Sequence, residues 1–190
     1  MKLKLLILVL ALQTAWLLGM VAAQEYALAH GKAILLETRP VDPRDMLSGD
    51  YLMLNYKIND VPTNLFSPPV KKDVPYSTKI FVALAPGTNE FYVVSRASTN
   101  ALAPSSGAEV VMSGKSTYAW WNATNSIHVE YGIERYYVAE GTGNPPVLRG
   151  NSGHGKHTAR VVVTESGRAR LQQVFLDGKP YEQAVKDTAQ

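Results

Sequence analysis

The sequence predicts a mainly β fold: a small β-barrel or sandwich-like exported domain carried on an N-terminal transmembrane helix, in a chain of 190 residues. Three observations predict it. An almost unbroken apolar run follows two lysines at the start of the chain. Beyond it, short segments alternate apolar and polar residues with a period of two, as half-buried strands do. Turn signals rich in Gly, Pro, Asn and Asp separate these segments, and few stretches have a helical period.

The N-terminal run, Leu5 to Ala23, follows Lys2 and Lys4. As a helix, about 19 residues at 1.5 Å each would span close to the ~30 Å hydrocarbon core of a bilayer. A cleaved signal peptide is the alternative, because Val21-Ala22-Ala23 would suit a cleavage site. We favour an uncleaved anchor, since the run is longer than a usual signal-peptide core and the helical pattern continues to Gly31, a suitable C-cap.

Export is expected under both interpretations, because the lysines stay on the cytoplasmic side and the rest of the chain lies outside. The predicted location is the cytoplasmic (inner) membrane, with a single pass and the C-terminal domain in the periplasm or outside. The chain has no cysteine, so a periplasm-like space is possible without any need for oxidation. Taking the two lysine charges from the formal +3 leaves +1 for the exported part. So small a charge argues against nucleic acid as a partner.

The predicted organisation has three parts. Residues 1–31 form the anchor helix (or signal peptide) and stalk, residues 32–183 form the all-β domain, and residues 184–190 form a frayed tail. The middle part is long enough for one domain with an ordinary core.

The predicted strands, in chain order, are Ala33–Glu37, Tyr51–Ile58, Thr78–Leu84, Glu90–Ser98, Glu109–Met112, Ser116–Trp121, Ser126–Tyr131, Thr158–Thr164 and Ala169–Leu176. Hairpin turns are predicted at Ala85–Asn89, Ser113–Lys115 and Glu165–Arg168. Two segments, Asp60–Pro75 and Gly141–His157, are longer than ordinary connections and are predicted to be functional or mobile loops.

The most informative segment leads into the strand at Tyr51–Ile58. Upstream of it, Asp42 would cap one helical turn that begins at Pro43 and is closed by Gly49. Asp50 then starts the strand. We expect its carboxylate to accept hydrogen bonds from nearby backbone N–H groups and to hold the turn. A role as a ligand or as a general base is the alternative.

Two tyrosines of this strand fall on opposite faces, because five residues separate them. Tyr56 shares the apolar face with Leu54 and is expected in the core. Tyr51 lies on the other face, either as an exposed strand residue or lining a groove with its hydroxyl free to meet a ligand or partner.

A second segment, Tyr131–Val138, places the charged pair Glu134 and Arg135 among aromatic residues. Buried charges need partners. We therefore expect this segment to pack on the first one, with Arg135 paired to a carboxylate such as Asp45 or Asp50. Scaffolding is the expected role of this arrangement, and a polar binding site is the alternative.

These two segments resemble the signature of the GDYXXLXY proteins, an uncharacterised bacterial family. Gly49, Asp50, Tyr51, Leu54 and Tyr56 are all in place, and Tyr131–Val138 followed by Glu140-Gly141 is similar to the family's other recurrent segment. The resemblance implies a small, membrane-anchored, exported domain and no particular activity. Some relatives are fused or adjacent to multi-span membrane proteins, which implies a partner of that kind.

The start of the chain also resembles signal-peptidase-like serine proteases, in which a Ser stands three residues before a Pro and a Lys seven after a Gly. Here those positions hold Pro40 and Tyr56, which cannot act as nucleophile and amine base. We therefore expect no enzyme activity and no catalytic residues. His154 and His157 lack a third ligand, so neither a metal nor another cofactor is expected.

The function expected from the sequence is an accessory or interaction module of the cell envelope, associated with an integral membrane protein. Two alternatives stay open. One is a hydrolase on a degenerate signal-peptidase-like scaffold. The other is a binder of small ligands or glycans that uses Tyr51, Trp120 or Trp121.

Overall fold

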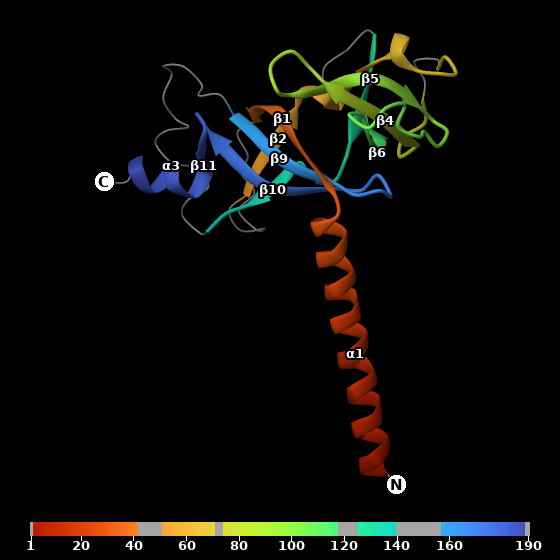
Figure 1. The fold of residues 1–190 in the computed structure, drawn as a ribbon, viewed down its shortest axis with the longest axis vertical. Helices are drawn as coiled ribbons and strands as arrows, with labels where there is room; N and C mark the ends of the chain where they lie inside the picture. Colours follow the sequence, from red (N-terminus) through yellow and green to blue (C-terminus); the bar gives the residue numbers. More distant parts are fainter. Residues whose placement is uncertain (1, 42–50, 71–73, 118–124, 140–156, 189–190) are drawn as a thin grey trace. The chain divides into compact units, whose positions relative to one another are not determined.

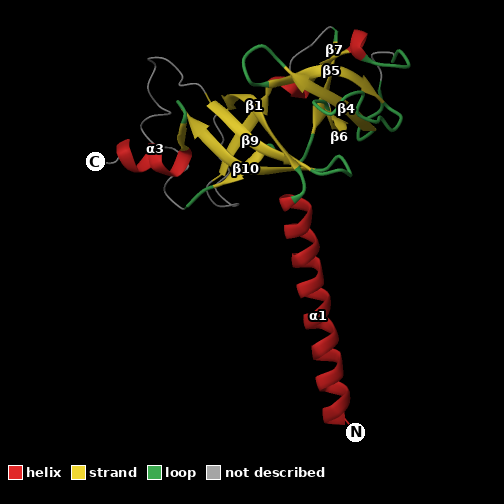
Figure 2. Cartoon of the chain, viewed as in Figure 1, coloured by secondary structure: helices red, strands yellow, loops and turns green. Residues whose placement is uncertain are grey.

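The computed structural model describes residues 2–41, 51–70, 74–117, 125–139 and 157–188. The chain divides into two compact units, Met1–Gly31 and Lys32–Gln190. The first is a helix and the second is built mainly of strands (Figure 2). The prediction of a mainly β fold on an N-terminal apolar helix is confirmed.

The first unit is the helix α1 (Lys2–Ala29), of 28 residues. Its segment Leu3–Ala29 is long enough and apolar enough to cross a membrane. Apolar side chains lie on all sides of the helix rather than along one stripe, which is typical of a membrane span. At its end, the backbone N–H of His30 donates to the Tyr26 carbonyl at 3.1 Å, and the two rings stack with centroids 3.9 Å apart.

The described strands of the second unit form two antiparallel sheets (Figure 1). One has the order β11-β10-β9-β1-β2-β8 and the other β3-β7-β6-β4-β5. The strands are β1 (Lys32–Val41), β2 (Tyr51–Tyr56), β3 (Asp60–Pro62), β4 (Lys79–Pro86), β5 (Tyr92–Ser98), β6 (Val110–Thr117), β7 (Ser126–Glu130), β8 (Arg135–Tyr137), β9 (His157–Val163), β10 (Ala169–Leu176) and β11 (Lys179–Pro180). Two short 3₁₀ turns, η1 (Lys57–Asn59) and η2 (Thr63–Leu65), and the helix α3 (Tyr181–Thr188) complete it.

The hydrophobic core draws on both sheets. Alternate residues of several strands point into it, among them Ile34 and Leu36 of β1 and Val82 and Leu84 of β4, all 0–2% exposed. This alternation follows from the period of a strand. A bridge between Leu35 and Phe91 brings β1 beside the second sheet.

Helix α3 links two distant strands of the six-stranded sheet. The Tyr136 hydroxyl of β8 donates to Glu182 Oε1 at 2.5 Å, and the Gln173 amide of β10 donates to Glu182 Oε2 at 3.1 Å. The hydrogen bond from Tyr136 lowers the pKa of Glu182. The Tyr136 ring also meets Tyr181 edge-on, at 6.1 Å between centroids. Because β8 and β10 stand far apart in the strand order, these contacts hold the sheet in a curled form.

The prediction of a hairpin turn at Ser113–Lys115 is wrong, because β6 runs without a break through Gly114. A Cβ atom at Gly114 would lie 2.5 Å from Val129 Cγ1 and 2.6 Å from the Glu130 carbonyl oxygen. The glycine therefore permits a close approach of β7 rather than a turn.

Two further segments differ from the prediction. The segment predicted as a loop, Asp60–Pro75, contains β3 and η2. The tail predicted to be frayed, 184–190, is helical as far as Thr188, because α3 packs by its own apolar face. Tyr181 and Ala184 are 1% and 8% exposed, and Lys179 of β11 pairs with Asp187 in the last turn of the helix at 2.7 Å.

Candidate functional site

Part of the predicted site lies outside the described residues. This holds for Asp42, Gly49 and Asp50 of the first motif and for Trp120 and Trp121 of the glycan-binding alternative. Their roles stay predictions. Glu140 and Gly141, which follow the second motif, are also outside them. The remaining residues of the two motifs are described, and they lie next to one another.

Within β2, the two faces differ as the alternation requires. Leu54 and Tyr56 are 3% and 1% exposed, whereas Tyr51 is half-buried on the opposite face. The Tyr56 hydroxyl donates to the Ile133 carbonyl at 2.8 Å. Burial, and secondly the charge of Glu134, raise the pKa of Tyr56. This hydroxyl therefore stays protonated and holds the backbone of the second motif in place.

The two motifs pair directly, as predicted. Strands β2 and β8 are antiparallel neighbours, with Tyr51 opposite Tyr137 and Met53 opposite Arg135. The guanidinium of Arg135 lies over the Tyr51 ring, with its Cζ 5.7 Å from the centroid. The carboxylates expected to pair with Arg135, Asp45 and Asp50, are outside the described residues, so that ion pair stays a prediction.

A polar group that we call the signature cluster joins the two motifs: Tyr56, Asn59, Tyr131 and Glu134. Asn59, 1% exposed, accepts from the Tyr56 backbone N–H at 2.5 Å. Its amide donates to the Val129 carbonyl at 2.7 Å and to Glu134 Oε1 at 3.3 Å. The side chain of Asn59 thus joins η1 to both β7 and the second motif.

Glu134 closes the turn of the second motif. Its carboxylate accepts from the backbone N–H groups of Tyr131 at 2.6 Å and Gly132 at 2.8 Å. Gly132 has φ +80°, a conformation that favours glycine. The Tyr131 hydroxyl donates to the Ile58 carbonyl at 2.8 Å, and burial raises its pKa. The carboxylate and hydroxyl oxygens of the signature cluster therefore bond to the protein's own backbone and side chains.

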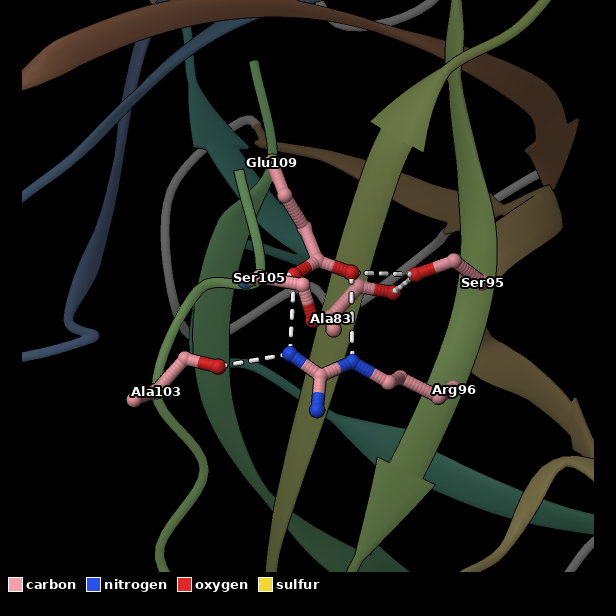
Figure 3. Close-up of polar contacts among 6 residues, drawn as sticks. All are labelled: Ala83, Ser95, Arg96, Ala103, Ser105 and Glu109. Carbon is pink, nitrogen blue, oxygen red and sulfur yellow. Dashed lines mark hydrogen bonds and ion pairs between the residues drawn. The ribbon is translucent and has the colours of Figure 1, made fainter. Parts of the chain in front are cut away.

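A second polar group, the loop anchor, surrounds Glu109 at the start of β6 (Figure 3). Arg96 of β5 donates to its carboxylate from Nη2 at 2.8 Å and from Nε at 3.3 Å. The Ser95 hydroxyl lies 2.8 Å from Glu109 Oε1, and the Ser105 backbone N–H donates to Oε2 at 2.5 Å. Arg96 also donates to the Ala103 carbonyl at 2.6 Å.

The loop anchor fixes the connection between β5 and β6. The hydrogen bonds from Arg96 are the main cause that lowers the pKa of Glu109 to about 2. Glu109 is 8% exposed, and both oxygens of its carboxylate accept hydrogen bonds. A charged group held this way is a poor general base, because its proton affinity is low and its lone pairs are engaged.

The family comparison agrees with the motifs. The model of the family described as GDYXXLXY protein matches residues 13–174. The chain belongs to this family. No curated protein and no solved structure matches it. Membership in the GDYXXLXY family therefore gives no molecular function.

The residues of the GDYXXLXY pattern fall into two structural groups, those in the core and those outside it. Leu54 and Tyr56 occupy the core, so packing explains why those positions are specified. Tyr51 does not belong to the core, and it contacts Tyr137 and Arg135 on the outer face of the sheet. The centroids of the Tyr51 and Tyr137 rings are 6.0 Å apart.

Two other polar side chains near these motifs have partners. Lys57, next to the position where the peptidase pattern has its lysine, pairs with Glu37 at 2.7 Å. His128 lies 2.8 Å from Asp60 across β7 and β3. In the part of the chain that the structure describes, no three His, Asp or Glu side chains gather in a way that could hold a metal ion.

Sequence reasoning missed Asn59 and the loop anchor. Nothing in the local pattern marks Asn59 as buried. The only available signal for the loop anchor was Glu109 itself, a charged residue immediately before the apolar run Val110–Met112.

Proposed function

We propose that this GDYXXLXY protein is a membrane-anchored, exported β domain that acts as an accessory or interaction module of an integral membrane protein, and that it is not an enzyme. The proposed location is the cytoplasmic (inner) membrane of a bacterium. The anchor is uncleaved and crosses the membrane once, with the β domain in the periplasm.

The observation that carries the proposal is α1. A helix of 28 residues with apolar side chains on all sides gains stability in a bilayer rather than in water. Lys2 and Lys4 precede the apolar run Leu5 to Ala23. Lysines are retained on the cytoplasmic side, so the chain after Ala29 would emerge on the outside.

The polar chemistry of the β domain favours a binding role over catalysis. The tyrosine hydroxyls of Tyr56 and Tyr131 donate to backbone carbonyls, and their pKa values are raised by burial. The Glu109 carboxylate is saturated by donors and its pKa is lowered. These groups stabilise turns and loops, and none of the three is poised to exchange a proton near neutral pH.

The proposed partner is a multi-span membrane protein. This part of the proposal rests on the resemblance to relatives that are fused or adjacent to such proteins. A single-span anchor also places the exported domain beside the outer loops of any membrane protein it accompanies. This raises the effective concentration of the domain at those loops.

The test is affinity purification from gently solubilised membranes with three tagged forms. These are the full-length chain, a chain with 2–29 replaced by an unrelated single-span helix, and a chain that starts at Gln24. We expect a multi-span protein to co-purify with the first two forms, in near-equal amounts with the bait, and to be lost from the third.

Identical partners for the membrane-bound and the Gln24 forms would contradict a role that depends on the anchor. A mature N-terminus near Gln24 in the purified full-length protein would show cleavage and would contradict the anchor itself. Turnover of a substrate by the pure protein, unchanged by removal of the partner, would favour an enzyme.

A further inference from the structure

Strand β8 stands at one end of the six-stranded sheet, so one of its edges faces away from β2. The direction of its backbone groups follows from the register. The Leu54 N–H donates to the Glu134 carbonyl at 2.7 Å, which makes these two a hydrogen-bonded pair. Such pairs alternate along an antiparallel ladder. Tyr136 therefore bonds to Leu52, and the N–H and C=O groups of Arg135 and Tyr137 point to the outer edge.

This outer edge is open among the described residues, where no strand pairs with it. The side chains beside it are also accessible: Tyr137 is 62% exposed and Arg135 is exposed. An edge with free backbone donors and acceptors is a template for another strand.

The edge is complementary to itself. If two β8 strands meet antiparallel with Tyr136 at the two-fold axis, Arg135 of each chain lies opposite Tyr137 of the other. The residues brought opposite each other are those whose N–H and C=O groups point outward, so four backbone hydrogen bonds can form. Each guanidinium would also face a tyrosine, the same contact that Arg135 already makes with Tyr51.

The register with the axis on Arg135 is less favourable. Centring the axis on Arg135 places the two guanidinium groups directly opposite each other, where like charges are destabilising. Within β8 it pairs only Arg135 with Arg135, so two backbone hydrogen bonds form between the strands instead of four. Of these two registers, the one centred on Tyr136 gives more backbone hydrogen bonds within β8 and the more favourable side-chain pairs.

We infer that two copies of this chain associate through their β8 edges, in the antiparallel register centred on Tyr136, and join their six-stranded sheets into one. A contact of three residues from each chain is far smaller than the ~1,200 Å² of a stable interface in solution. The association therefore rests on the proposed anchoring, because two copies held in one membrane meet at high effective concentration.

The register can be tested by disulfide trapping, since the chain has no cysteine of its own. Two differently tagged full-length chains, Arg135→Cys and Tyr137→Cys, are co-expressed and their membranes are oxidised. Opposed residues of a hydrogen-bonded pair have Cα atoms about 5.5 Å apart, within the range of a disulfide. We expect the mixed disulfide to exceed, several-fold, both the disulfides formed by either variant alone and those of the control Val93→Cys, which is 50% exposed on β5.

A second pair of variants isolates the backbone donor. Tyr137→Pro removes an N–H that faces the outer edge and leaves the β2–β8 ladder intact, whereas Tyr137→Thr removes the ring and keeps the N–H. With full-length chains labelled at the C-terminus in lipid vesicles, we expect energy transfer between copies to be lost in Tyr137→Pro and retained in part in Tyr137→Thr.

Mixed disulfides no more abundant than those of Val93→Cys, or equal energy transfer in the two Tyr137 variants, would overturn the pairing. Equal yields from the single variants and from the mixture would overturn the register. Membrane fractionation distinguishes the two proposals: a soluble chain contradicts the anchor, while an anchored chain without the mixed disulfide contradicts the pairing alone.

Discussion

The loop anchor gives the sharpest test of how this β domain is stabilised. In the variant Glu109→Gln the side chain keeps its shape and loses its charge, so the two hydrogen bonds from Arg96 lose their charged acceptor. The amide NH₂ group also replaces one of the two oxygens that accept from Ser95 and Ser105. The connection between β5 and β6 should then be held less firmly.

The magnitude follows from the pKa of Glu109, which falls from 4.5 to about 2 in the folded protein. At about 1.4 kcal/mol per pH unit, this shift sets an upper bound of about 3 kcal/mol on the stabilisation by the charge. Arg96 is 34% exposed, so solvent screens part of the interaction. We therefore expect Glu109→Gln to lower the free energy of unfolding by about 1–2 kcal/mol at pH 7.

The pH dependence has a definite sign. Because the folded pKa of Glu109 lies below the unfolded value of 4.5, its contribution is complete above that value and is lost as pH falls towards about 2. The difference in unfolding free energy between wild type and Glu109→Gln should be constant from pH 8 to about 5.5 and should shrink below it.

The assay is urea unfolding of the full-length protein in detergent micelles, followed by far-ultraviolet circular dichroism between pH 3 and 8. Glu165→Gln, in the exposed turn between β9 and β10, is the matched control and should leave the unfolding free energy within about 0.5 kcal/mol of wild type. The reasoning fails if Glu109→Gln behaves like this control. It also fails if the difference stays the same from pH 8 down to pH 3.

Two further predictions concern packing and a buried hydrogen bond. Gly114→Ala should destabilise the protein by about 1–3 kcal/mol, because the new methyl group would clash with Val129, whereas Gly107→Ala, with nothing within 4 Å, should have little effect in the same urea assay. Tyr56→Phe should cost about 1–2 kcal/mol, because it leaves the Ile133 carbonyl without its donor in the core. An unfolding midpoint equal to that of wild type in either variant would contradict the corresponding contact.

Most of the strand arrangement follows from local pattern. The strand predicted at Ala169–Leu176 has those bounds in the structure, because alternation and the glycine turn before it are both local features. Gly114 shows where such reasoning fails. A glycine between two β-forming segments indicates a turn in the sequence, yet here it marks the close approach of a neighbouring strand that no local pattern reveals.

The polar clusters were harder to predict from the sequence, for a related reason. The pairing of the two motifs was predictable, because charged residues within an apolar segment need partners. Asn59 and Glu134, in contrast, meet only after the chain has brought η1 beside the second motif. Arg96 and Glu109 come from either side of a long connection, and neither has a feature that identifies the other as its partner. Their roles depend on tertiary geometry, which one sequence does not specify residue by residue.

The GDYXXLXY pattern mixes two kinds of requirement, and separating them indicates where a function shared by the family should be sought. A core of this shape needs side chains like Leu54 and Tyr56 whatever the protein does, so these positions carry no information about activity. Tyr51 is different, because the core does not use its ring. The ring lies instead with Arg135 and Tyr137, beside the open edge of β8. If that edge pairs with a second copy, Tyr51 supports the arginine that crosses the interface, and replacing it with valine should weaken the association while leaving the fold intact.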